Sequence, residues 1–119
     1  MDALTIWDAA KANDVDGVLD LISPSGGVHV DERNDLGETA LHIAAGRGHD
    51  RLCGVLLERG ASAGAADWES RWTPLHRALY FGHLRAALVL LKHGAYLGDE
   101  ELHGYVPNKQ DRAGGGGGG

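Results

Sequence analysis

The chain has 119 residues, and because the last six are glycines, about 110 remain to fold, which is close to the size of one domain. Hydrophobic residues make up 43% and charged residues 24% of the chain, values that exclude global disorder. There are 11 Lys and Arg against 17 Asp and Glu, a net charge of -6 with no basic run, so nucleic acid and anionic membranes are not expected as partners.

Cysteine content and hydropathy indicate an intracellular location. Cys53 is the single cysteine, so it forms no internal disulfide and no zinc cluster, which fits a reducing compartment. The N-terminus lacks the basic region and apolar stretch of a signal peptide, and the longest apolar run, residues 86–91, is too short to cross a bilayer. We therefore expect a cytoplasmic or nuclear protein.

The first predicted unit, residues 3–27, consists of two short helices and a long closing loop. Its first helix opens with Ile-Trp-Asp-Ala-Ala at residues 6–10, and Trp7 is expected to be a packing residue of this end unit. An end unit needs a polar outer face. The residues expected to supply it are Lys11, Asp14, Asp16 and Asp20.

The second unit, residues 35–61, and the third, residues 69–97, repeat one another at an offset of 34 residues. Four pairs of short sequences share this offset: Thr-Ala-Leu-His at 39–42 with Thr-Pro-Leu-His at 73–76, Gly-His at 48–49 and 82–83, Val-Leu-Leu at 55–57 and 89–91, and Gly-Ala at 60–61 and 94–95. Four coincidences at one offset, involving His and Pro, establish an internal repeat.

Each repeat is predicted to hold two helices. Thr39 and Thr73 are suited to cap the first helix, and Pro74 suits its first turn. The second helix has an apolar stripe at helical spacing. The stripe residues are Leu52, Val55 and Leu56 in the second unit and Leu84, Leu88 and Leu91 in the third. A fourth unit begins at residue 98 but lacks an apolar helix, and residues 108–119 are expected to form a disordered Gly-rich tail.

These features resemble the ankyrin repeat, whose pattern is a turn followed by Thr-Pro-Leu-His-x-Ala and two antiparallel helices. The resemblance implies an all-α solenoid of about three helix-turn-helix repeats with β-turn or hairpin fingers, in a domain of residues 1–107. It also implies that His42 and His76 brace the turn through a hydrogen bond. The structural positions of the motif are Thr39, Leu41, His42, Gly48, Thr73, Pro74, Leu75, His76 and Gly82.

One turn departs from the ankyrin pattern. The segment Asp-Trp-Glu-Ser-Arg-Trp at residues 67–72 carries an extra residue and lacks the usual glycine, so this finger should differ in shape from the preceding one.

Neither metal binding nor catalysis is expected. Four of the seven histidines belong to the repeat, and the other three are scattered in loops without the short spacings of a zinc site. No nucleophile, base and orienting group share a segment, and a stack of repeats lacks a deep enclosed pocket. We therefore expect no catalytic residue, no metal, no cofactor and no small-molecule substrate.

Partner-binding candidates are large or charged side chains at positions where the repeat pattern requires nothing. Aromatic residues and Arg dominate interface energetics. The candidates are Leu36, Glu38, Arg47, Trp68, Arg71, Trp72, Tyr80 and Phe81. The alternative is that Trp72 packs under its finger and Phe81 covers the gap left by an incomplete fourth repeat. The net charge favours a protein partner with basic rim residues.

Residues 68–79 also look like the ankyrin segment of the inhibitor of Bruton tyrosine kinase family, whose members join ankyrin repeats to a propeller and BTB modules. That resemblance implies a scaffold or a ubiquitin-ligase adaptor. The function expected is non-catalytic protein binding through the concave groove and fingers, by a monomer or a segment of a larger chain. The alternative is a structural spacer or an intramolecular docking segment.

Overall fold

The computed structural model describes residues 4–97, which form six helices and, within that range, no strand. The helices come in pairs. The pairs are α1 (Ile6–Lys11) with α2 (Val15–Ile22), α3 (Ala40–Arg47) with α4 (Asp50–Glu58), and α5 (Pro74–Tyr80) with α6 (Leu84–Lys92). The fourth unit and the Gly-rich tail lie outside the described residues.

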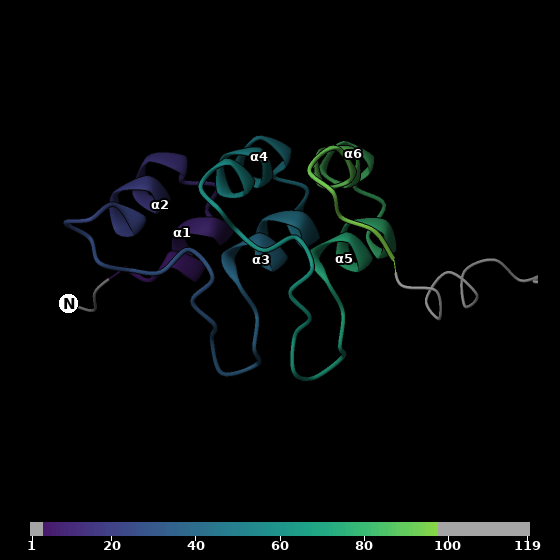
Figure 1. The fold of residues 1–119 in the computed structure, drawn as a ribbon, viewed down its shortest axis with the longest axis horizontal. Coiled ribbons are helices and arrows are strands. Elements are labelled where there is room, and N and C mark those ends of the chain that lie inside the picture. The colour runs from purple at the N-terminus through teal and green to yellow at the C-terminus, as the bar shows by residue number, and fades with distance from the viewer. Residues whose placement is uncertain (1–3, 98–119) are drawn as a thin grey trace, which may run out of the picture.

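The three pairs stack in chain order and form two layers of helices. Helix α3 contacts both α1 and α5 in the inner layer, and α4 contacts α6 in the outer layer (Figure 1). Two long loops, the fingers, project beyond the inner layer ahead of α3 and α5 (Figure 1). No described helix is long and apolar enough to cross a membrane.

The repeated threonines and histidines set the start of the inner helices. Thr39 accepts a hydrogen bond from the His42 backbone N–H, and the Thr39 backbone N–H donates to His42 Nδ1 at 3.1 Å. Because Nδ1 accepts this bond, the ring proton is on Nε2, which donates to the Trp72 carbonyl at 2.8 Å. Thr73 and His76 form the same capping box on α5. This reciprocal capping satisfies backbone groups that the first turn of a helix leaves open.

Trp7 takes the bracing position in the first repeat. It is half-buried, and its Nε1 donates to the Glu32 carbonyl at 3.1 Å, as His42 does to Trp72 in the second repeat. An indole N–H therefore replaces an imidazole N–H as the link from an inner helix to the next finger.

The core is built from leucine and small side chains. Alanines on the inner helices let the stacked helices approach closely, and the large buried side chains fill the space between the layers. These large side chains are chiefly Leu41, Leu52, Leu56, Leu75 and Leu90.

The apolar stripe expected on the second helix of the third repeat is not part of this core. Leu84 and Leu88 have exposed fractions of 68% and 59%, and Leu91 is exposed as well. The core contribution of α6 comes instead from Ala86, Ala87 and Leu90. The physical reason is position in the stack: α6 packs on α4 with one side, and the described residues place no helix on its other side.

The second finger has the different shape that its sequence predicts. In the first finger Asn34 N–H donates to the Glu38 carbonyl, whereas in the second Asp67 N–H donates to the Trp72 carbonyl, so the second loop is one residue longer. Arg71 has a φ of 63°, a left-handed conformation that Gly37 adopts in the first finger with a φ of 79°. The Asp67 side chain stabilises this turn, because it accepts hydrogen bonds from the backbone N–H groups of Ser70 and Arg71.

Candidate protein-binding groove

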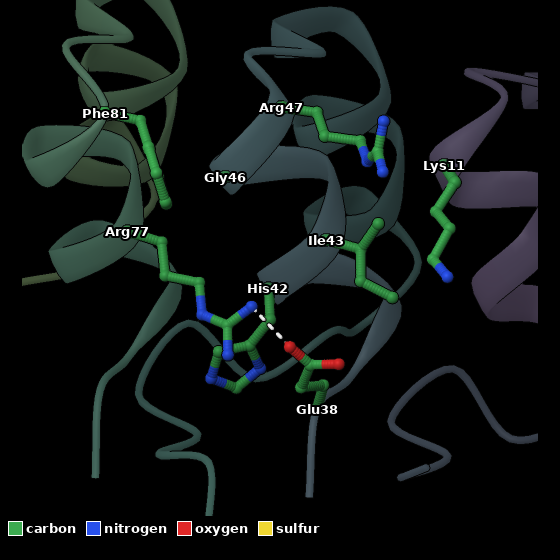
Figure 2. A pocket seen from close by; sticks show the side chains of 8 residues that line it. All are labelled: Lys11, Glu38, His42, Ile43, Gly46, Arg47, Arg77 and Phe81. Atoms are coloured by element: carbon green, nitrogen blue, oxygen red, sulfur yellow. Dashed lines mark ion pairs between the residues drawn. The ribbon is translucent and has the colours of Figure 1, made fainter. Parts of the chain in front are cut away.

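A hollow of about 360 Å³ lies on the inner helices where they meet the fingers. We call this hollow the groove. It is lined by residues of all three repeats, and Figure 2 shows them closing around one space. The lining residues are Lys11, Glu38, His42, Ile43, Gly46, Arg47, Arg77 and Phe81.

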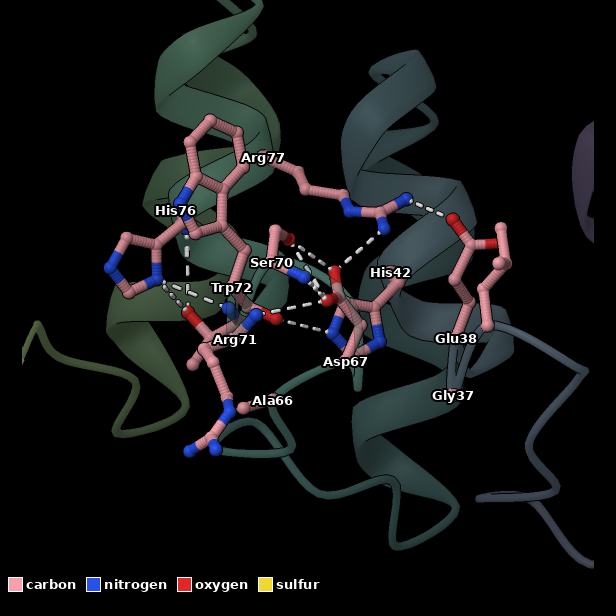
Figure 3. Close-up of polar contacts among 12 residues, drawn as sticks. Gly37, Glu38, His42, Ala66, Asp67, Ser70, Arg71, Trp72, His76 and Arg77 are labelled. Atoms are coloured by element: carbon pink, nitrogen blue, oxygen red, sulfur yellow. Dashed lines mark hydrogen bonds and ion pairs between the residues drawn. The ribbon is translucent and has the colours of Figure 1, made fainter.

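Arg77 holds the wall of the groove in place. Its guanidinium forms ion pairs with Glu38 at the base of the first finger and with Asp67 at the base of the second, the latter at 2.8 Å (Figure 3). Asp67 is buried, and its remaining contacts are hydrogen bonds from Ser70 and Arg71. One side chain of α5 therefore ties together the bases of both fingers.

The ionisation of this network follows from its contacts. Burial raises the pKa of Asp67, but hydrogen bonds from Arg77 and Ser70 outweigh it and hold the pKa well below its usual range. For Glu38, burial likewise raises the pKa, and bonds from Asn34 and Arg77 reverse the shift. Burial lowers the pKa of Arg77, and its two carboxylate partners raise it above the usual value. All three groups are charged at neutral pH.

His42 forms a neutral part of the groove floor. Burial lowers the pKa of its imidazole, and the hydrogen bond to the Trp72 carbonyl only partly offsets this effect. The imidazole is therefore a structural brace, with Nδ1 and Nε2 both engaged.

Aromatic side chains continue from the groove along α5. The Trp72 ring lies 6.0 Å from His76 and 5.0 Å from Tyr80, and the Tyr80 ring lies 5.0 Å from Phe81 in an edge-on arrangement. Trp72 is half-buried by these contacts, whereas Tyr80 and Phe81 have exposed fractions of 67% and 57%. The packing expected as an alternative thus applies in part to Trp72, and Tyr80 and Phe81 remain open to solvent.

The fingers are joined near Leu36 and Trp68. Trp68 N–H donates to the Leu36 carbonyl at 3.0 Å, and Arg33 donates to the carbonyls of both Gly37 and Ala66 at 2.8 Å. The Trp68 ring packs against Gly37, where an added Cβ would lie 2.4 Å from the indole. Leu36 and Trp68 are nevertheless exposed, so they present an apolar surface held by backbone hydrogen bonds.

The structure distributes the sequence-predicted candidates over two neighbouring areas. Glu38, Arg47 and Phe81 line the groove. The candidates that lie on the fingers or along α5, outside that hollow, are Leu36, Trp68, Arg71, Trp72 and Tyr80. Arg71 is exposed on its finger.

Sequence reasoning missed three residues of this region: Arg77, Asp67 and Lys11. A signal for Arg77 was present, because the repeat offset aligns it with the buried Ile43, and a charged side chain there requires a partner. The sequence predicts Lys11 on the polar face of the end repeat, and it is exposed, but it lines the groove as well. Its position relative to Arg47 depends on how α1 stacks on α3.

Other reactive groups are structural. Cys53 is fully buried, and burial together with the nearby Asp50 raises the pKa of its thiol to about 12. Within the described residues, no group of three or more His, Cys, Asp or Glu is arranged to hold a metal ion.

The fold and the repeated motif define the class of protein. A family model described as "Ankyrin repeats (3 copies)" matches residues 6–101, so the chain belongs to the ankyrin-repeat family, as its sequence motif predicts. The all-α repeat fold is confirmed as well.

The similarity to the inhibitor of Bruton tyrosine kinase family is also confirmed. Inhibitor of Bruton tyrosine kinase from Xenopus laevis is 41% identical over 76 residues, which are 63% of this chain and 6% of that protein. B-cell lymphoma 3 protein homolog from Mus musculus is 40% identical over 85 residues, 66% of this chain and 19% of that protein. Protein phosphatase 1 regulatory subunit 12A from Mus musculus is 36% identical over 55 residues, 46% of this chain and 5% of that protein. The chain spans only a small part of each relative.

Proposed function

We propose that this chain is a non-catalytic recognition module that captures a partner protein with its groove and fingers. The observation that carries the proposal is the exposure of four large apolar side chains, two on the fingers and two at the end of α5, outside the buried core. These side chains are Leu36, Trp68, Tyr80 and Phe81. Exposed apolar surface of this kind marks interaction sites. Ankyrin-repeat relatives with regulatory and inhibitory names support the same function.

The mechanism is burial of aromatic surface against the partner, with charged side chains that set the register of the partner on this surface. Tyr80 and Phe81 supply rigid apolar area at the end of α5, and Trp72 supports Tyr80 from below. Arg47 and Arg71 are exposed and available to partner carboxylates or carbonyls. Glu38 acts through Arg77, which it fixes in the groove wall.

The partner proposed is a protein in the cytoplasm or nucleus, bound by a monomer or by this segment of a larger chain. The net charge of -6 supports a protein over nucleic acid or an anionic membrane. Stacked repeats create extended concave surfaces, which supports a macromolecular partner over a small-molecule substrate.

A second function, a spacer or intramolecular docking segment of a larger protein such as a ubiquitin-ligase adaptor, is favoured by one observation. Leu84, Leu88 and Leu91 form an exposed apolar stripe on α6, the last helix of the described residues, and none of the three lines the groove. The greater length of the relatives supports this alternative.

Two matched double variants separate these functions. Tyr80→Ala/Phe81→Ala removes apolar surface at the groove, and Leu84→Ala/Leu88→Ala removes exposed apolar surface from α6. We expect proteins from the native cell to be retained by the wild type and by the α6 variant, and to be lost from the Tyr80/Phe81 variant, with unchanged melting curves for both. Loss of retained proteins from the α6 variant alone would favour the docking segment. Unfolding of the Tyr80/Phe81 variant would contradict the exposure on which the proposal depends.

A further inference from the structure

The groove contains positive charge that the described residues, 4–97, do not neutralise. Figure 2 shows the side chains of Lys11, from α1, and Arg47, from α3, extending toward the space in front of Ile43. Both side chains are exposed, and residues 4–97 provide no ion-pair partner for either. The position of Lys11 is held from the second repeat, because His49 Nε2 donates to the Lys11 carbonyl at 3.2 Å.

The acidic groups nearby are already engaged. One Glu38 oxygen pairs with Arg77, and the other accepts a hydrogen bond from Asn34 at 2.8 Å. Asp67 is buried against the second nitrogen of Arg77. Arg77 is therefore paired with two carboxylates, whereas Lys11 and Arg47 are the lining cations that form no ion pair within residues 4–97.

The neighbouring hollow provides a contrast. It shares Lys11 with the groove and is also lined by Arg33, Asp8 and Asp35, so cations and carboxylates are equal in number along its lining, although no ion pair joins them. The lining of the groove, by contrast, holds Lys11, Arg47 and Arg77 against the single carboxylate of Glu38, an excess that does not follow from the net charge of the chain, which is -6.

We infer that the groove selects an acidic segment of the partner protein, with an Asp or Glu side chain of the partner placed between Lys11 and Arg47. An apolar partner residue next to that carboxylate would lie against Ile43 and Phe81, which line the same hollow. This inference rests on the proposed groove-binding function and specifies the chemistry of the partner. The overall charge of the chain favours a partner with basic residues, whereas the charge of the groove favours an acidic segment.

The test is a selection of short random peptides displayed on phage against the immobilised wild-type chain. Peptides that bind the groove are identified by loss of binding to Tyr80→Ala/Phe81→Ala. We expect these peptides to be enriched in Asp or Glu next to an apolar residue. Each selected peptide and its Asn or Gln counterpart then serve as the fluorescent probes for affinity measurements.

Lys11→Ala/Arg47→Ala is expected to weaken binding of the acidic probe about tenfold or more, the equivalent of one or two charge-assisted hydrogen bonds. It should leave the amide probe unchanged. Arg51→Ala/Lys92→Ala is the matched control, because it removes the same charge from exposed positions on the outer helices. This control should bind both probes as the wild type does. Higher ionic strength should weaken binding of the acidic probe to the wild type more than binding of the same probe to the Lys11/Arg47 variant.

Three results would overturn the inference. If the groove-dependent peptides were not enriched in Asp or Glu, the proposed function would stand, but the inference of an acidic partner would be wrong. An equal loss of affinity in the Arg51/Lys92 control would assign the effect to net charge. A selection that yields no groove-dependent peptide would contradict the proposed function itself, and the inference with it.

Discussion

Arg71 shows how a single residue adapts the ankyrin motif to a longer finger. Its left-handed backbone, with a φ of 63°, closes the turn where the first finger uses Gly37. A non-glycine residue pays roughly 1–2 kcal/mol for this conformation. The hydrogen bond from Arg71 N–H to Asp67 Oδ1, at 3.1 Å, helps to hold the turn and does not depend on the Arg71 side chain.

Arg71→Gly is therefore expected to stabilise the chain. The relief of backbone strain exceeds the extra entropy that glycine gives the unfolded chain, for a net gain of up to about 1 kcal/mol. Thermal or urea unfolding measures the change. Glu69→Gly, at an exposed position of the same finger with ordinary backbone geometry, should instead lower stability. A lower melting temperature for Arg71→Gly would contradict the argument.

At the scale of the element, α6 shows that an apolar residue on a helix is not always a core residue. Leu90 is fully buried on α6, a helix that packs against α4 and α5, whereas Leu88, two positions earlier, has an exposed fraction of 59%. The two leucines differ only in the side of the helix from which they project.

Leu90→Ala should lower the free energy of unfolding by about 2–5 kcal/mol, the usual cost of removing a buried leucine side chain. Leu88→Ala should change the free energy of unfolding by about 0.5 kcal/mol or less, because most of the Leu88 side chain is exposed to solvent. Chemical denaturation of both variants provides the measurement, and each is the control for the other. Equal losses would show that α6 is covered in solution.

At the scale of the whole molecule, the repeats depend on their neighbours. The inner helices contact in chain order, and the bases of the fingers are joined by Arg77. Repeats of this kind cannot bury their apolar faces alone, and three are about the minimum for a stable stack. A local change in the Asp67 network is therefore expected to alter the stability of the entire stack.

Acid should destabilise the protein in a defined direction. Asp67, Glu38 and His42 all have folded-state pKa values below their ordinary ones, so the unfolded chain binds more protons. The stability from each group is complete above its unfolded pKa, about 6.5 for His and about 4 for the carboxyls, and is lost as the pH falls toward its folded pKa.

Asp67→Asn is expected to be less stable than the wild type at pH 7, since it removes the charge that pairs with Arg77. It should lose less stability than the wild type between about pH 5 and pH 2, because the group that takes up a proton is gone. Urea denaturation at a series of pH values gives both quantities. Parallel pH profiles would contradict the low pKa of Asp67. Asp20→Asn, at an exposed carboxyl on α2, is the control and should retain the wild-type profile.

Much of the fold could be predicted from sequence because each ankyrin unit carries local signals. Thr39 with His42, and Thr73 with His76, contain within four residues the groups that form the capping box. The different shape of the second finger could also be predicted, because the missing glycine and the extra residue lie within the finger's own sequence. The groove was predicted less completely, because the pairing of Arg77 with two carboxylates from different fingers depends on distances across the stack.

The repeat, the helix pairs and the aromatic residues where the motif requires none can be read from the amino-acid sequence, because they depend on residues close together in the chain. Which apolar stripe is buried, and which charges form no ion pair within residues 4–97, depends on how the repeats stack. Burial of a helix face depends on whether another helix lies against it, as Leu88 and Leu90 illustrate. The charge of a groove depends on which partners its side chains reach. Lys11 and Arg47 come from different repeats, and stacking brings them to the same hollow.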